Sequence, residues 1–204
     1  MLFRSHLQLL PANQDFYPPN ADLDDPPPPN TSLYWSSLLN VYGAVKPGIS
    51  QIWLQNPYMD TDIVGTIVPD PVDDRLLIYN IDPDTLPQNT LDPVDSVINP
   101  LNVGPNAGLP GPINGRRYLI VEDVGSPGSP TVAWGDLVAN ANDIIQFDAD
   151  SMSWFVAFNS QEATTVEFVT NLTTSIQYRY IPSQGLWTKS YEGWYDQGDY
   201  SIVI

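Results

Sequence analysis

The chain has 204 residues, and its 24 acidic and 7 basic side chains give a formal net charge of −17. It has no cysteine and one histidine, so disulfides, thiolate catalysis, Cys-ligated metals and sites built on several histidines lack their components. With an isoelectric point near 4.1 and no basic stripe, we expect no nucleic-acid binding. Hydrophobic residues make up 42%, enough for a core, whereas 21 prolines exclude a helical bundle.

The first ten residues, MLFRSHLQLL, contain a short apolar run of the kind found in signal peptides. Ser5, His6 and Gln8 interrupt the run, and no small-residue cleavage site follows it. No stretch of the chain reaches the ~18–20 apolar residues that cross a bilayer. We therefore expect neither secretion nor a membrane span.

Residues 1–30 are predicted to form an extended, proline-rich arm. Residues 11–30 read PANQDFYPPNADLDDPPPPN, and the four consecutive prolines cannot donate backbone hydrogen bonds and hold φ near its polyproline II value. This composition is typical of a linker. It also suits an arm that binds a neighbouring subunit, for which the candidate contact residues are Phe16, Tyr17, Pro26, Pro27, Pro28 and Pro29.

Residues 31–114 are predicted to be rich in loops, with short strands and one short helix. The apolar spacing from Leu33 to Tyr42 favours the helix, which Thr31 or Ser32 would cap. The strand-like stretches are Ile52 with Leu54, residues 63–68 and residues 76–79.

Residues 82–115 contain prolines at seven positions, which argues against interior strands and helices. A compact monomer rarely carries so long a loop without a purpose. Packing of this segment over a partner subunit would explain it.

Acidic pairs recur in the same region, and they have two interpretations. Carboxylates close together on turns can bind calcium, but Asp-Pro and Pro-Asp steps are also ordinary turn chemistry. Because no window matches an EF-hand loop, we favour solvated turns. The pairs are Asp60/Asp62, Asp73/Asp74, Asp82/Asp84 and Asp92/Asp95.

Residues 115–204 are predicted to form a domain of repeated β-hairpins. In two stretches, an aromatic residue precedes a tryptophan by seven positions and another follows it by four. A turn-forming patch separates two alternating runs in each, as in a hairpin with aromatic side chains on one face. The two sets are Phe147, Trp154, Phe158 and Tyr180, Trp187, Tyr191.

A third, reduced hairpin is expected from Trp194 to Ile204, and Thr164–Val169 adds a strand. Isolated hairpins are unstable, so these elements must join in one sheet or a small barrel. The predicted fold class is therefore mainly β: an antiparallel meander or small barrel, with long proline-rich loops and an N-terminal arm.

The aromatic residues of the hairpins, with Trp194, have two interpretations. They can be the core of a small β-domain, which their regular alternation favours. Alternatively, exposed Trp and Tyr rings can stack on sugars, which would make the chain a glycan- or receptor-binding module. The sequence leaves both open.

No catalytic constellation emerges from the sequence. Two carboxylates would suffice for glycoside hydrolysis, but no glutamate lies in a recognisable motif, and no Gly-rich phosphate loop is present. We expect no enzymatic activity, no catalytic residues, no metal site and no cofactor.

Several C-terminal stretches carry a resemblance: GRRYLIVEDVG from Gly115, then NDIIQF and WFVAF, then FVTNLTTSIQYRY and WTKSYEG. Together they resemble structural proteins of tailed bacteriophages, in particular the T4-like phages of cyanobacteria. The resemblance covers about residues 115–204. It implies a virion component, made in the host cytoplasm, that binds other phage structural proteins in a homo- or hetero-oligomer.

Overall fold

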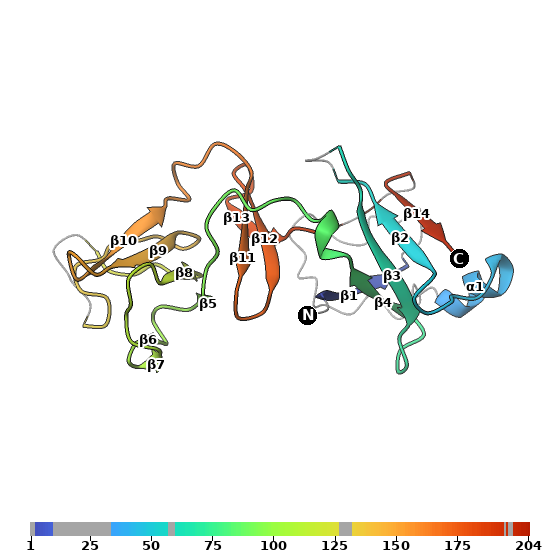
Figure 1. The fold of residues 1–204 in the computed structure, drawn as a ribbon, viewed down its shortest axis with the longest axis horizontal. Helices are drawn as coiled ribbons and strands as arrows, with labels where there is room; N and C mark the ends of the chain where they lie inside the picture. Colours follow the sequence, from blue (N-terminus) through green and yellow to red (C-terminus); the bar gives the residue numbers. More distant parts are fainter. Residues whose placement is uncertain (1–2, 10–33, 57–59, 127–131, 194, 196–197) are drawn as a thin grey trace. The chain divides into compact units, whose positions relative to one another are not determined.

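The computed structural model describes residues 3–9, 34–56, 60–126, 132–193, 195 and 198–204. Its contacts divide the chain into two compact units. We call residues 1–86 with 193–204 the discontinuous unit, and residues 87–192 the continuous unit. Both consist mainly of β-strands (Figure 1), which confirms the predicted fold class.

The discontinuous unit contains one antiparallel five-stranded sheet. In spatial order its strands are β1 (Phe3–Gln8), β4 (Leu76–Ile81), β3 (Ile63–Pro69), β2 (Gln51–Leu54) and β14 (Tyr200–Val203). Strands β2, β3 and β4 confirm the strand-like stretches. Two features differ from expectation: β1 is a strand paired with β4 and not part of an extended arm, and β14 pairs with β2 and not within a third hairpin.

One face of this sheet is buried. Successive side chains of a strand point to opposite faces, and in β3 and β4 buried residues alternate with half-buried ones. The Tyr79 hydroxyl lies on the buried side and donates a hydrogen bond to the Ile63 carbonyl at 3.1 Å. The buried face is formed by Ile52, Leu54, Ile63, Ile67, Leu77, Tyr79 and Ile81.

The expected helix is α1 (Trp35–Tyr42), and it begins later than predicted. Its N-cap is Tyr34, which makes no side-chain capping bond. Asp74 binds the first turn instead: its carbonyl accepts from the Trp35 amide at 3.1 Å, and its carboxylate accepts from the Ser36 hydroxyl at 2.6 Å. Within the described residues, no helix combines the length and apolar character needed to cross a membrane.

The continuous unit contains two larger sheets and a two-residue pair. The first sheet has the order β10 (Ser153–Phe158), β9 (Ile144–Asp148), β8 (Arg117–Ile120), β5 (Ser96–Ile98), with β5 parallel to β8. The second has the order β11 (Glu167–Asn171), β12 (Ile176–Ile181), β13 (Leu186–Lys189). Strands β6 (Gly104–Pro105) and β7 (Gly108–Leu109) form the pair. No sheet of the described residues closes into a barrel, so the barrel alternative is wrong.

Both repeated hairpins form where the aromatic pattern predicted them. Strands β9 and β10 place Phe147 opposite Trp154, and β12 and β13 place Tyr180 opposite Trp187. The seven-residue spacing therefore corresponds to a direct cross-strand pair, the arrangement in which side chains of neighbouring strands interact most strongly. The hairpins belong to different sheets and not to the single sheet expected.

The proline-rich segment 82–115 is more ordered than the sequence predicted. It holds the 3₁₀ helix η1 (Pro83–Thr85) and the edge strand β5, and Val94 is fully buried. The Val94 amide donates to the Thr170 carbonyl at 3.0 Å. The segment therefore belongs to the continuous unit from Pro87 onward. The sequence had instead predicted a boundary between a loop-rich region, residues 31–114, and a hairpin domain, residues 115–204.

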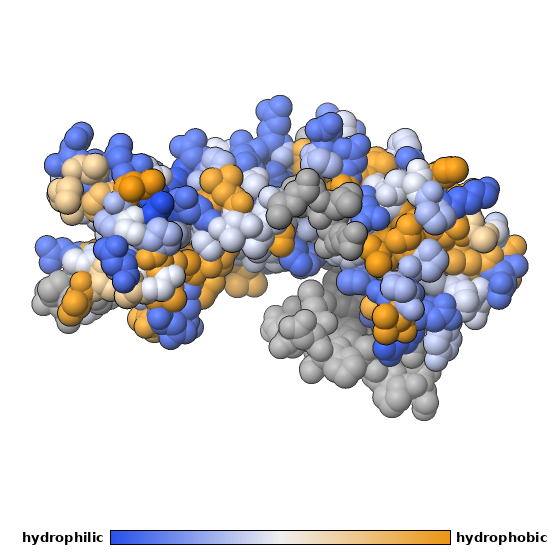
Figure 2. Space-filling view, turned by 60° about the horizontal axis from the view of Figure 1, so that its bottom comes forward, coloured by the Kyte–Doolittle hydropathy of each residue, from blue (hydrophilic) through white to orange (hydrophobic). Residues whose placement is uncertain are grey.

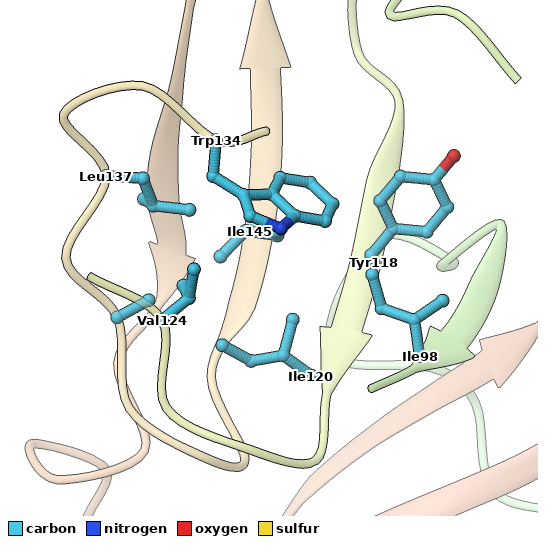
Figure 3. Packing of buried hydrophobic residues seen from close by; sticks show 8 residues of the cluster. Ile98, Tyr118, Ile120, Val124, Trp134, Leu137 and Ile145 are labelled. Carbon is cyan, nitrogen blue, oxygen red and sulfur yellow. The ribbon is translucent and has the colours of Figure 1, made fainter. Parts of the chain in front are cut away.

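Two apolar clusters fill the continuous unit. The larger one (Figure 3) contains Ile98, Tyr118, Ile120, Val124, Trp134, Leu137, Ala139 and Ile145. The smaller one contains Val94, Leu119, Ile144 and Val169. Neighbouring residues of β8 enter different clusters, because the sheet is covered on both faces there.

Candidate functional site

The arm residues proposed as partner contacts, Phe16, Tyr17 and Pro26–Pro29, lie outside the described residues. Trp194 also lies outside them. The structure therefore places six of the predicted site residues, all in or next to the two hairpins of the continuous unit.

The first hairpin contributes its aromatic pair to a cluster of four rings. The Trp154 ring centroid lies 5.3 Å from that of Phe147, 5.6 Å from Tyr118 and 5.1 Å from Trp134. The Trp134 indole donates to the Pro100 carbonyl at 3.0 Å, so its polar group is satisfied inside the protein. The cluster fills the space above β8 and β9.

The second hairpin forms a three-ring cluster with the end of the first. The Trp187 centroid lies 5.5 Å from that of Phe158 and 5.3 Å from Tyr180. The Trp187 indole donates to the Asn142 carbonyl at 2.9 Å, and the Tyr180 hydroxyl donates to the Ser160 carbonyl at 2.8 Å. These bonds hold the second hairpin against residues that belong to the first sheet and its loops.

The six placed aromatic residues face the interior to different degrees. Phe147, Tyr180 and Tyr191 are buried. Trp154, Phe158 and Trp187 are half-buried, with rings in contact with other rings. A sugar-binding platform needs open ring faces, whereas in these clusters the rings pack on one another in edge-to-face, tilted and stacked pairs. The arrangement is that of a core.

The acidic pairs act mainly in turns and ion pairs. The Asp73 carboxylate lies 2.5 Å from the Arg75 guanidinium, whose hydrogen bonds lower the pKa of Asp73 to about 2. Asp82 caps η1 by accepting from the Asp84 amide, and Asp92 pairs with Arg117 at 3.1 Å. Among the described residues, no group of three or more His, Cys, Asp or Glu side chains is placed to hold a metal ion.

A surface that the sequence analysis missed lies on the discontinuous unit. We define the outer sheet face as Gln51, Trp53, Val64, Thr66, Val68, Ile78, Ser201 and Val203. They alternate with buried residues in β2, β3 and β4 and with half-buried residues in β14. The pairing register places Trp53 opposite Val64 and Ser201, Val68 opposite Ile78, and Gln51 opposite Thr66 and Val203. Apolar side chains are therefore neighbours on this face.

This face combines exposed apolar residues with few charged ones. Trp53 is 41% exposed and Val203 is 53% exposed. None of the residues in β2, β3, β4 and β14 is charged. The fifth strand, β1, places His6 opposite Ile78 and Arg4 opposite Asn80, and His6 lies 3.3 Å from the Asp70 carboxylate. Figure 2 shows hydrophobic residues at the surface of this unit. A partly apolar face of this kind, whose charged residues are confined to its β1 edge, is typical of a contact surface.

One sequence signal pointed to this face. In IVGTIVP, Val64, Thr66 and Val68 alternate with Ile63, Gly65 and Ile67, so that both alternations contain apolar residues. A run apolar on both alternations predicts a strand covered on both sides. In the structure the residues of one alternation are buried, whereas Val64, Thr66 and Val68 on the other are half-buried.

Comparisons with models of protein families, with curated proteins and with solved structures find no match to this chain.

Proposed function

We propose that the chain is a non-enzymatic assembly protein that binds neighbouring protein subunits. The resemblance of residues 115–204 to structural proteins of tailed bacteriophages makes a virion the assembly we propose. In this view the chain is made in the host cytoplasm and its contacts are with other structural proteins.

The observation that supports a binding role most directly is the outer sheet face. Burying an exposed Trp, Val or Ile side chain fully contributes roughly 1.5–3 kcal/mol, and tryptophan is enriched among the residues that dominate interface energies. Charged side chains, which are costly to desolvate, are absent from four of the five strands of the sheet and occur on this face only at its β1 edge. Covering this face with another protein surface would therefore be favourable.

The edge strand β14 adds a second reason. Its described pairing is with β2 alone, so its other side offers unpaired backbone groups within the described residues. Proteins commonly protect such an edge with charge or proline, and β14 reads YSIV. The open edge and the outer sheet face are continuous, which suits a partner that contacts both.

The proposed arm and central loop contribute differently to this function. Phe16, Tyr17 and the four prolines remain proposed contacts. The central segment packs within its own unit through Val94 and Ile98, and its contact with a partner subunit remains a proposal for its other residues.

The glycan-binding alternative receives less support. Its candidate rings, Trp154 and Trp187, are half-buried and in contact with other rings. A protein-binding role requires no such open ring face.

A second copy of this chain is the neighbour that can be tested first. We expect sedimentation velocity of the purified chain to show association that increases with concentration. The double variant Trp53→Ser with Val203→Ser should remain monomeric over the same range. A wild-type chain that stays monomeric, or a double variant that associates equally, would contradict the assignment of this face.

The continuous unit supplies a matched control. Phe155 is 42% exposed and Leu186 is 52% exposed, close to the 41% of Trp53 and the 53% of Val203. The double variant Phe155→Ser with Leu186→Ser removes comparable apolar area from the other unit. It should associate as the wild type does.

A further inference from the structure

The two edge strands of the five-stranded sheet differ in charge (Figure 1). Strand β1, at one edge, reads FRSHLQ and carries Arg4 and His6, and the His6 imidazole lies 3.3 Å from the Asp70 carboxylate. Strand β14, at the other edge, reads YSIV and carries neither a charged residue nor a proline. Charge and proline are common means of preventing an edge strand from pairing with another chain. Of the two edges of this sheet, only β1 has such protection among the described residues.

The backbone of β14 offers hydrogen-bonding groups on the side away from β2. In an antiparallel ladder, every second residue of a strand bonds to a given neighbour. The Gln55 amide donates to the carbonyl of Asp199, the residue before β14, at 2.7 Å. The odd-numbered residues of β14 therefore bond to β2, whereas the amide and carbonyl groups of Tyr200 and Ile202 point to the open side. These four groups have no hydrogen-bond partner within the described residues.

A second copy of β14 complements these groups. Two antiparallel strands offer each other donors and acceptors in the same alternating order, so a strand with an open side can pair with its own copy across a two-fold axis. Each copy carries a net charge of −17, which disfavours contact between charged parts of two copies. Because β14 is uncharged, two copies can meet along this edge without like charges directly opposite each other.

The alternation leaves two registers with the axis inside β14. An axis at Ser201 would pair Tyr200 with Ile202, and it would place the carboxylate of Asp199 opposite the apolar Val203. An axis at Ile202 pairs this residue with itself and places Ser201 opposite Val203 on the outer sheet face. The second register keeps charged residues out of the pairing, and for this reason we favour it.

We propose that two copies of the chain pair through β14, antiparallel about a two-fold axis at Ile202, so that their five-stranded sheets become one continuous sheet. The two outer sheet faces then form one surface, on which only Ser201 lies between Trp53 and Val203 of the second copy. This inference rests on the proposed self-association and adds the strand that pairs and its register.

Hydrogen exchange of the β14 amides, measured by NMR in the dilute and the associated chain, tests the pairing with an internal control. The Ser201 and Val203 amides bond to β2 and should be protected in both samples. The Tyr200 and Ile202 amides should exchange quickly in the dilute chain. They should exchange roughly tenfold more slowly when about nine-tenths of the chain is associated, because exchange then proceeds from the free tenth.

Sedimentation velocity of the same samples separates the two possible failures. Association without slower exchange at Tyr200 and Ile202 would overturn the pairing through β14 and leave the proposed function intact. A chain that stays monomeric would contradict both.

Single cysteines determine the register, because the chain has no cysteine of its own. In an equimolar mixture of Ser201→Cys and Val203→Cys chains, the proposed register places two thiols on directly opposite residues that do not exchange backbone bonds, within disulfide distance. Oxidation of the mixture should give disulfide-linked dimers. Ser201→Cys alone should give none, because its two thiols are offset by two residues along the paired strands. An absence of dimers in the mixture, or dimers from Ser201→Cys alone, would overturn the register.

Discussion

The two units of this chain use apolar side chains in opposite ways. The continuous unit turns its tryptophans inward, where Trp134 and Trp187 also satisfy their indole N–H groups on backbone carbonyls. The discontinuous unit buries one face of its sheet and leaves Trp53 and Val203 on the other. Aromatic residues therefore stabilise one unit, and apolar residues form a contact surface on the other.

The largest effect should come from Trp154→Ala. The substitution removes ring contacts with Phe147, Tyr118 and Trp134, and we expect it to lower the free energy of unfolding of the continuous unit by ~3–5 kcal/mol. Urea denaturation measures the loss. As a control, Phe155→Ala replaces the exposed neighbour and should lower the free energy of unfolding by less than about 1 kcal/mol. Equal losses of stability in the two variants would contradict an interior role for Trp154.

A buried carboxylate gives the next largest effect. Asp143 is 1% exposed and accepts from the Asn140 amide, the Ser160 amide and the Ser160 hydroxyl, at 2.8, 2.8 and 2.7 Å. Asp143→Ala leaves buried donors without partners and should cost about 2–4 kcal/mol in denaturant unfolding. As a control, Asp123 accepts from the Ala141 amide in an exposed loop, and Asp123→Ala should cost about 1 kcal/mol or less.

Trp53→Ser tests the exposed tryptophan of the discontinuous unit against the packed Trp154 of the continuous unit. Because Trp53 is 41% exposed and makes its indole hydrogen bond to Gln51 at the surface, we expect a loss of roughly 1 kcal/mol or less under dilute, monomeric conditions. Its main effect should be on association. A loss as large as that of Trp154→Ala would show that Trp53 is structural.

Alkaline pH should weaken the continuous unit. Burial raises the pKa of Tyr191 from 10.0 to about 12, so the neutral phenol is favoured in the folded chain. This contribution is complete below pH 10 and is lost as the pH rises towards 12. Stability measured across this range should fall less steeply in Tyr191→Phe, whereas Tyr42→Phe, an exposed control, should follow the wild type.

The smallest effect is expected in acid. The pKa of Asp73 is lowered from 3.8 to about 2, so its contribution is present above pH 4 and is lost as the pH falls towards 2. The pair with Arg75 is at the surface, where screening by solvent reduces its worth. Carboxyl NMR titration should give a midpoint near 2 in the wild type and a higher midpoint in Arg75→Gln.

The sequence predicted the structural features that depend on residues close to one another in the chain. The spacing from Phe147 to Trp154 and from Tyr180 to Trp187 predicted both hairpins, because a tight hairpin pairs residues at fixed separations. It did not predict that β14 pairs with β2, since such pairing depends on contacts between distant residues. The helix start was predicted too early because Asp74, 39 residues after Trp35, binds the first turn.

The candidate surfaces were harder to predict for the same reason. The outer sheet face combines residues from several strands, and the neighbourhood of its apolar residues is visible only once the order of the strands is known. Periodicity identifies which side chains share a strand face, but it does not identify which strands and loops meet.

Oxidative footprinting of the tryptophans tests the central contrast most directly. In the dilute chain we expect Trp53 to be oxidised quickly, and Trp154, Trp187 and the buried Trp35 slowly; at concentrations where the chain associates, only Trp53 should gain protection. Fast oxidation of Trp154 and Trp187 in the dilute chain, or an unprotected Trp53 in the associated one, would contradict the account.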